Sequence, residues 1–317
     1  MVARYGSAMA APPTSTDATV AIETRALTKR FGGILALDGL TMGVPRGETF
    51  GFLGPNGAGK TTAVKLLLGL VPPSGGEARL LGRSIGDRET RRRVGYLPEH
   101  FRYQGWLSGR EVLALHCELA GLPRASWAAE IDRALAIVGL DGRGDDRVAG
   151  YSKGMQQRLG VAVALLGRPE LVFLDEPTSA LDPVGRAEMR EIIRDLRAGG
   201  TTVFLNSHLL TEVEQVCDRV AIVDRGRVVV IGTLDALLAE GPVRVRVSGL
   251  GETELAALAA FGSIEREDDG LVVRGLDRER VPALVAELVR LGGRIFAVEV
   301  HHQTLEDRFR ELVERHP

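Results

Sequence analysis

The sequence predicts an α/β protein of two units, a larger one around a mainly parallel β-sheet and a smaller one of the α+β class. Over residues 20–232, short and continuously apolar runs alternate with helical patterns and Gly-rich turns. Such runs are typical of parallel strands that helices cover on both faces. The clearest are Thr49–Leu53, 171–174 and 202–205. Beyond residue 241 the expected order is strand, helix, two strands, helix and strand, as in ferredoxin-like domains.

The chain is therefore expected to consist of three segments. Residues 1–19 are rich in Pro, Thr and small side chains and lack the apolar core of a signal peptide, so we expect a disordered leader. Residues 20–240 should hold the parallel sheet, and residues 241–317 the ferredoxin-like unit with a terminal helix. The Gly241-Pro242 pair marks the expected boundary between the two cores.

The expected terminal helix, residues 305–315, carries one apolar stripe on an otherwise charged surface. Leu305, Phe309 and Leu312 stand at i, i+4 and i+7, so they share one face and have to cover something. Because fold alone does not assign a role, three roles for the small unit stay open. They are support of a dimer, packing within the chain and ligand sensing.

Composition excludes several classes of protein. The formal net charge of −2 argues against a broad basic surface for nucleic acid. No apolar run approaches the ~18 residues that a membrane-spanning helix needs. The two cysteines, Cys117 and Cys217, lie far apart and form no CxxC motif, so we expect neither a disulfide scaffold nor a thiolate metal site.

The strongest chemical signal is a phosphate-binding loop. Residues 54–62 read GPNGAGKTT, which satisfies G-x-x-x-x-G-K-[ST] between the strand Thr49–Leu53 and an expected helix at 63–68. Glycines let backbone N–H groups turn toward phosphate oxygens at a helix N-terminus. Lys60 should reach the β- and γ-phosphates, and the Thr61 hydroxyl should ligate Mg²⁺. The expected nucleotide-binding residues of this loop are Asn56, Gly57, Ala58, Gly59, Lys60, Thr61 and Thr62.

A pair of carboxylates is the second signal. Asp175 and Glu176 directly follow the apolar run 171–174, at the strand end where open α/β sheets bind ligands. Two adjacent acids are costly there without a cation. We therefore expect Asp175 to hold Mg²⁺, directly or through water, and Glu176 to orient and activate the attacking water.

With these two motifs in place, residues 20–232 resemble the nucleotide-binding subunit of an ATP-binding cassette (ABC) transporter. The resemblance implies the P-loop ABC cassette fold, a mainly parallel sheet core with an antiparallel β part and a helical subdomain. Four further segments match the family's motifs in order. They are Phe31 in KRFG at 29–32, the signature-like YSKGMQQR at 151–158, the D-loop-like LDP with Asp182, and the switch-like His208 in NSHL at 206–209.

The signature-like segment implies a second chain. From the residues alone, Ser152 and Gly154 precede a helical run and form another anion-binding nest. In the family, the signature faces the nucleotide of the partner subunit, so Ser152, Lys153 and Gly154 are expected to act in trans in a homodimer around two ATP. Lys153 and Met155 depart from the usual LSGGQ, whereas Ser152 and Gly154 match it.

The resemblance also implies roles for single residues around the nucleotide. His208 is expected to contact the γ-phosphate and stabilise charge on the transferred phosphoryl group. Phe31 stands where the family usually has a Tyr that stacks on adenine. Glu99, in GYLPE at 95–99, stands where most members have Gln, and its carboxylate is expected to ligate Mg²⁺ together with Thr61 and Asp175.

We therefore expect an ATPase subunit with ATP and Mg²⁺ as cofactors. Its partners would be a second copy of itself and separate integral-membrane permease subunits at the cytoplasmic face of the membrane, with no nucleic acid. The GYLPE and YSKGM forms and the tail at 304–309 resemble the ABC-2 type exporter group, which moves drugs, antibiotics, lipids and similar cargo. The alternatives are a soluble ABC ATPase that acts on nucleic acid or ribosomes, and a nucleotide-sensing module without hydrolysis.

The two tryptophans fall in the helical stretch between Glu99 and Ser152. For Trp106 and Trp127 we expect core packing, with a contact to the membrane partner as the alternative.

Overall fold

The computed structural model describes residues 19–179, 181–238, 241–267, 270–300 and 304–314. The expected leader therefore lies outside the described residues, except for Thr19. Contacts divide the chain into two compact units, Met1–Ile231 and Gly232–Pro317. The sequence predicts this boundary after residue 240, behind helix α8 (Leu234–Leu238). The contacts group α8 with the smaller unit.

A six-stranded sheet forms the centre of the larger unit. β9, β3, β8, β7 and β6 are joined by parallel pairing. β3, β7 and β8 are buried along their whole length because both faces of the sheet are covered. In spatial order the strands are β10 (Arg227–Thr233), β9 (Arg219–Asp224), β3 (Thr49–Leu53), β8 (Thr202–Asn206), β7 (Leu171–Asp175) and β6 (Val94–Leu97).

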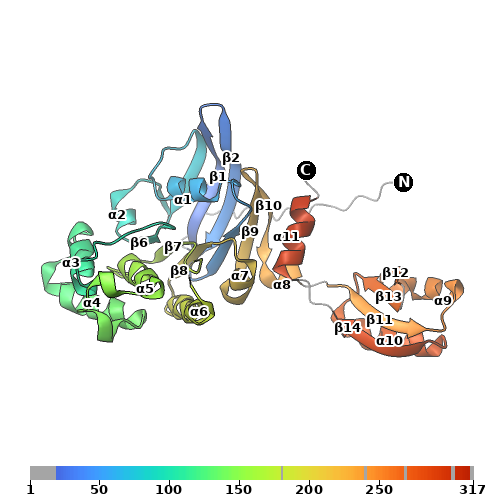
Figure 1. Ribbon diagram of the computed structural model, residues 1–317. Helices are drawn as coiled ribbons and strands as arrows, with labels where there is room; N and C mark the ends of the chain where they lie inside the picture. Colours follow the sequence, from blue (N-terminus) through green and yellow to red (C-terminus); the bar gives the residue numbers. More distant parts are fainter. Residues whose placement is uncertain (1–18, 180, 239–240, 268–269, 301–303, 315–317) are drawn as a thin grey trace. The chain divides into compact units, whose positions relative to one another are not determined.

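An antiparallel sheet faces the central one across helix α1 (Lys60–Leu67) (Figure 1). Its strands are, in spatial order, β2 (Ile34–Pro45), β1 (Val20–Phe31), β4 (Gly75–Leu80) and β5 (Arg83–Ser84). One hydrophobic core joins both sheets through the buried face of α1. Phe50, Phe52 and Phe173 pack around Phe204 at its centre, with ring centroids 5.1–5.8 Å from that ring.

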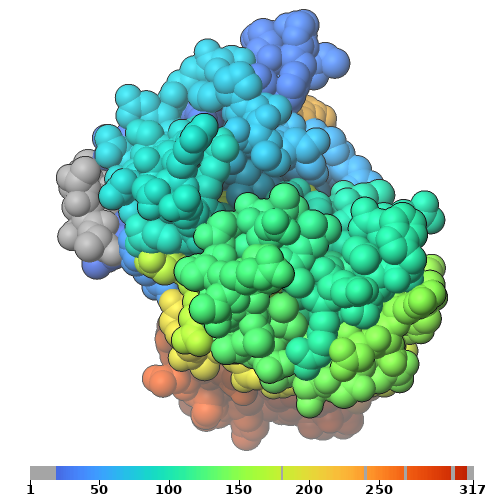
Figure 2. All heavy atoms as spheres, turned by 90° about the vertical axis from the view of Figure 1, so that its left-hand side faces the viewer, coloured from blue at the N-terminus to red at the C-terminus, as the bar shows by residue number. Residues whose placement is uncertain are grey.

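A helical segment inserts between β6 and β7, and Figure 2 shows it (teal to green) covering much of one face of the larger unit. Its main helices are α3 (Gly109–Leu119), α4 (Trp127–Ile137) and α5 (Lys153–Ala164). Ser108 and Glu111 form a capping box that fixes the start of α3. The remaining helices of the unit are α2 (Arg88–Arg91), α6 (Pro183–Ala198) and α7 (Leu210–Val216). The predicted cassette architecture of two sheets and a helical part is confirmed.

The two tryptophans of this segment have different environments. Trp127 is partly buried, and its Nε1 donates a hydrogen bond of 2.9 Å to the Leu122 carbonyl. Trp106, just before α3, has 71% of its surface exposed. The prediction of core packing is therefore wrong for Trp106, because the preceding loop leaves its ring on the surface. Within the described part of the chain, none of the helices has the length and apolar character needed to span a bilayer.

The smaller unit contains a four-stranded antiparallel sheet with its own core. β11 pairs with β13 on one side and β14 on the other, and β12 pairs with β13. The core includes Val243, Val245, Leu258, Leu284 and Leu288. The elements are β11 (Val243–Ser248), α9 (Glu252–Ala257), β12 (Ser263–Glu267), β13 (Gly270–Arg274), α10 (Val281–Arg290) and β14 (Arg294–Val300).

The terminal helix α11 (Leu305–Glu314) lies against α8 within the smaller unit. Leu305 is fully buried, and Phe309 and Leu312 are partly buried. Part of the apolar stripe is therefore covered inside the chain. This contact favours the option of intrachain packing for the helix.

Candidate functional site

The phosphate-binding loop sits between β3 and α1, and α1 begins at Lys60, three residues before the expected start. Gly59 adopts a φ of 97°, and a Cβ atom there would lie 2.4 Å from the Ala36 carbonyl oxygen. Only glycine fits this position, because it combines a left-handed backbone with a close approach of another strand. The loop is therefore held against β2 in a turn that requires glycine at this position.

Lys60 is buried beside the loop. Its Nζ donates hydrogen bonds to the carbonyls of Gly54 (2.7 Å) and Pro55 (3.2 Å). Burial lowers the pKa of Lys60, while Glu176, Asp175 and Glu99 act in the opposite direction. Phosphate oxygens are stronger acceptors for an ammonium group than backbone carbonyls. Lys60 is thus a charged group positioned to exchange carbonyl partners for a phosphate.

The two carboxylates lie at the carboxyl end of β7. Asp175 has 2% of its surface exposed and Glu176 has 6%. Asn206, at the end of the neighbouring strand β8, donates from Nδ2 to Asp175 Oδ1. The backbone N–H of Glu176 donates to the Asn206 carbonyl at 2.8 Å. Glu176 has a φ of 53°, an uncommon left-handed conformation for a residue other than glycine. Asn206 therefore fixes both acids.

Charge around Asp175 is unbalanced. Burial, helped by the carboxylates of Glu99 and Glu176, raises the pKa of Asp175 to about 6, although Asn206 and Lys60 act to lower it. Burial, together with the negative charges of Asp175 and Glu99, raises the pKa of Tyr96 to about 12. A cation placed between these acids would relieve the repulsion.

Glu176 contacts His208 directly. His208 Nδ1 lies 2.8 Å from Glu176 Oε1, and the imidazole is half exposed. The other carboxylate oxygen, Glu176 Oε2, is buried and has no hydrogen-bond partner among the described residues. An orphaned buried acceptor is costly, so a donor such as water is expected to occupy it. The site thus has one oxygen held by His208 and one free to accept a proton.

The expected magnesium ligands fit a hard cation. Asp175 supplies a buried carboxylate, Glu99 a half-exposed one, and Thr61 an exposed hydroxyl on the first turn of α1. The described residues contain no group of three or more His, Cys, Asp or Glu side chains that could form a metal cage. Mg²⁺ is usually held by one or two carboxylates with phosphate oxygens and water, so the residues present fit it.

The signature-like residues lie at the surface. Ser152 caps α5, with its Oγ accepting from the Met155 N–H at 3.2 Å, and both Ser152 and Lys153 are exposed. Asp182 caps α6 and accepts from the Gly185 N–H at 2.8 Å. Of the hydrogen bonds and ion pairs between described residues, none joins Ser152 or Asp182 to Lys60 or the acid pair. Ser152 and Asp182 are therefore accessible to a ligand or a second chain.

Phe31 ends β1, and 48% of its surface is exposed. Lys29 Nζ lies 4.9 Å from the centre of the Phe31 ring, a cation–π contact. The remaining exposed area leaves the aromatic ring accessible to another planar group.

Asn206 is the residue that sequence reasoning missed. It occurs in the NSHL segment, but only the parallel pairing of β7 with β8 places it opposite Asp175. A polar residue at the end of a buried strand, next to another strand that ends in two acids, is the signal that could have found it.

Comparisons with known proteins agree on one family. Residues 37–179 match the family described as ABC transporter. An ABC transporter ATP-binding protein of Nostoc, all4389, is 43% identical over 284 residues, which are 89% of this chain and 84% of that protein. The daunorubicin/doxorubicin resistance ATP-binding protein DrrA of Streptomyces peucetius is 36% identical, covering 94% of each chain. A solved ATP-binding subunit of an ABC transporter has a TM-score of 0.62 at 32% identity, covering 68% of this chain and 91% of that one.

Proposed function

The chain belongs to the ABC transporter family as an ATP-hydrolysing subunit of the exporter type, and we propose that two copies of it share two Mg²⁺–ATP sites. The observation that supports the chemistry is the environment of Glu176, which has one oxygen against His208 and the other buried without a partner. A base with these contacts is prepared to accept a proton from water.

In this proposal the loop residues 56–62 bind the phosphates, and Lys60 exchanges its carbonyl partners for the β- and γ-phosphates. Thr61, Asp175 and Glu99 would hold Mg²⁺, which when bound neutralises charge on the phosphates. Glu176 Oε2 accepts the proton of the attacking water. His208 holds the other oxygen of Glu176 and stabilises the transferred phosphoryl group. Phe31 stacks on adenine.

The second copy supplies the signature. Ser152, Lys153 and Gly154 are at the N-terminus of α5, and in this proposal they bind the γ-phosphate of the other chain. Asp182 begins the helix that follows the acid pair and would lie at the same interface.

A separate membrane permease would be the second partner, with this chain at the cytoplasmic face of the membrane. The exposed Trp106 ring is a candidate contact to that permease, because a large isolated aromatic surface is typical of interfaces. Besides DrrA, similar proteins are the linearmycin resistance ATP-binding protein LnrL of Bacillus subtilis and the bacitracin transport ATP-binding protein BcrA of Bacillus licheniformis. We therefore propose export of a drug-like, antibiotic or lipid cargo.

The domain limits remain 1–19, 20–240 and 241–317 in this proposal, and the last segment is a ferredoxin-like accessory domain. Support comes from the observed order β-α-β-β-α-β and the spatial order β12-β13-β11-β14, in which all neighbouring strands are antiparallel. That order places the first and third strands at the centre, as in the split βαβ arrangement.

Mixing two inactive variants tests the shared site. Lys60→Ala removes phosphate binding in one chain, and Ser152→Arg blocks the signature in the other. A heterodimer of the two contains one intact composite site, so the mixture should regain ATP hydrolysis that neither variant shows alone. A mixture that stays inactive, while each variant still dimerises, would contradict the trans arrangement. Wild-type turnover that is first order in enzyme at all concentrations would do the same.

A further inference from the structure

Asn206, the last residue of β8, has a buried side-chain amide that is only half satisfied by the chain. The residue has 2% of its surface exposed. Its Nδ2 donates to Asp175 Oδ1, whereas its own Oδ1 is buried and has no hydrogen-bond partner among the described residues. Orphaned buried acceptors are rare in native proteins because they are costly. The amide oxygen of Asn206 therefore calls for a donor from a ligand or its water.

The amide of Asn206 lies on the face of the central sheet that α1 covers. Asn206 and Asp175 are directly opposite each other in the parallel register of β7 and β8. Because side chains alternate along a strand, they share a face with Phe173 and Phe204. Both rings belong to the core that the buried face of α1 joins, and α1 starts at Lys60 of the phosphate-binding loop. Asn206 is therefore on the nucleotide side of the sheet.

Asp175 is held through one of its two oxygens. Of the hydrogen bonds between described residues, only the one from Asn206 Nδ2 reaches the Asp175 carboxylate, and it reaches Oδ1. The carboxylate is thus kept in one orientation, with Oδ2 left for a further ligand. Carboxylates that bind metals are usually oriented in this way by a hydrogen bond from a neighbouring residue.

We propose that Asn206 is a positioning residue of the Mg²⁺ site: its Nδ2–H holds Asp175 Oδ1 and leaves Oδ2 to the cation, and its Oδ1 accepts a hydrogen bond from a water of the cation. Mg²⁺ usually keeps several waters when it binds to proteins. An amide both donates to a carboxylate and accepts from water, which an aspartate or a leucine of the same size cannot do. This role rests on the proposed function, because it concerns the metal site at Asp175.

Calorimetric titration of the full chain with adenylyl imidodiphosphate, an ATP analogue that is not hydrolysed, tests the proposal. The affinity is measured with excess Mg²⁺ and again with excess EDTA, and the wild type should bind more tightly with Mg²⁺. Asn206→Leu is similar in size and removes both the donor and the acceptor. It should lose most of this gain in affinity, while its affinity in EDTA should equal that of the wild type.

Hydrolysis of ATP gives a second measurement. In Asn206→Leu the free Mg²⁺ concentration for half-maximal turnover should rise by about 10–100-fold, as is typical when a residue that orients a metal ligand is lost. Asn206→Ser keeps a shorter donor and acceptor. It should show a smaller change in the same direction in both measurements, and it provides the test if the leucine variant does not fold.

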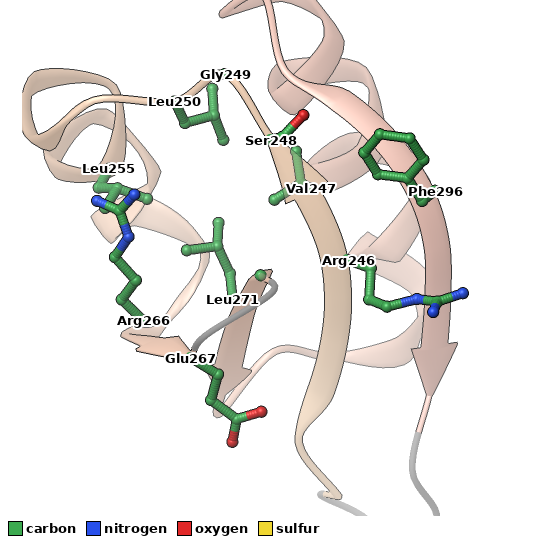
Figure 3. Close-up of a pocket in the computed structure, with 11 residues that line it drawn as sticks. Arg246, Val247, Ser248, Gly249, Leu250, Leu255, Arg266, Glu267, Leu271 and Phe296 are labelled. Atoms are coloured by element: carbon green, nitrogen blue, oxygen red, sulfur yellow. The ribbon is translucent and has the colours of Figure 1, made fainter.

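Two variants serve as controls. Thr202→Val changes the first residue of β8, which is 1% exposed and accepts at Oγ1 from the Gly47 N–H at 2.9 Å. It removes a buried hydrogen bond at the other end of the same strand, so it should lower stability and leave the gain from Mg²⁺ unchanged. Ser248→Ala changes the last residue of β11, which lines a cavity of the smaller unit (Figure 3). It should alter neither affinity.

The outcomes separate the role of Asn206 from the proposed function. If Mg²⁺ gives the wild type no gain in affinity, the metal site itself is wrong, and the role of Asn206 with it. A gain that both Asn206 variants retain in full would overturn only the role of Asn206. An equal loss of affinity in EDTA, or the same loss of the gain in Thr202→Val, would also overturn it, because a purely structural effect would then explain the result.

Discussion

The two units of this protein differ in how deeply they bury charged side chains. The cassette buries Lys60, Asp175 and Glu176, each with 8% or less of its surface exposed. Among the described residues of the smaller unit, no charged side chain is buried to this degree, and the ion pairs Arg244–Glu267, Arg274–Glu265 and Arg290–Glu287 lie at the surface. Burial of charge is costly unless a partner compensates it. The contrast indicates that the cassette needs a charged ligand to compensate its buried charges. The smaller unit has no such need, because water solvates its charged side chains.

The largest effect is expected at the buried acid. Glu176→Gln should lower kcat for ATP by about 10²–10⁴-fold, because the variant lacks the oxygen that takes the proton of water. ATP binding should stay near the wild-type value, since Lys60 and the loop are unchanged, and the ATP-bound dimer should accumulate. Steady-state hydrolysis and nucleotide binding measured on the same preparation check this. Glu265→Gln, in the smaller unit, is the matched control, and its turnover should equal that of the wild type.

The raised pKa of Asp175 predicts a pH dependence of stability. The folded-state pKa of about 6 exceeds the ordinary value of 3.8, so the folded protein holds a proton there between these values that the unfolded chain has lost. Stability from this group is therefore present at low pH and is lost as pH rises from about 4 to about 6. The difference corresponds to about 3 kcal/mol at neutral pH.

Asp175→Asn should remove the loss of folding stability that the charged Asp175 causes at neutral pH. Without nucleotide or Mg²⁺, the variant should unfold at a higher denaturant concentration than the wild type at pH 7.5, and the two should converge near pH 4. The same variant should lose Mg²⁺-dependent hydrolysis. Chemical denaturation across the pH series measures the effect. Equal stability of both proteins at pH 7.5 would show that the charge of Asp175 is compensated within the chain.

A smaller effect is expected at the surface of the cassette. Asp182→Ala removes the side chain that caps α6 and should cost about 1 kcal/mol of stability. If Asp182 also acts at the dimer interface, turnover should fall further than the loss of stability explains. Asp182→Ser retains a capping group and separates the two roles. Wild-type turnover in the Ser variant would limit Asp182 to the cap.

The smallest effect tests the independence of the two units. A chain ending at residue 240 keeps the buried charges and should bind ATP with wild-type affinity. Thermal unfolding of the cassette should change only modestly, because α11 packs on α8, a helix that the contacts group with the smaller unit. Equilibrium dialysis with ATP on the truncated chain, after circular dichroism shows that it is folded, is the measurement. Loss of ATP binding in a folded truncated chain would contradict the domain boundary.

Patterns among neighbouring residues are sufficient to predict the strands and the phosphate-binding loop. Thr49–Leu53 is a strand with the expected bounds, and the runs 171–174 and 202–205 lie within β7 and β8, because continuous apolar runs depend only on neighbouring residues. The phosphate loop was equally local, since glycines, a lysine and a helix start act within nine residues. The sequence likewise indicated the acid pair after β7.

The tertiary structure decided what distant residues do to each other. Only the pairing of β7 with β8 brings Asn206 to Asp175, and only the loop after β8 brings His208 to Glu176. The pKa of Asp175, the exposure of Trp106 and the packing of α11 on α8 follow from such contacts too. A pattern along the chain contains no distances between remote segments, so burial and charge coupling appear only once the sheet is assembled.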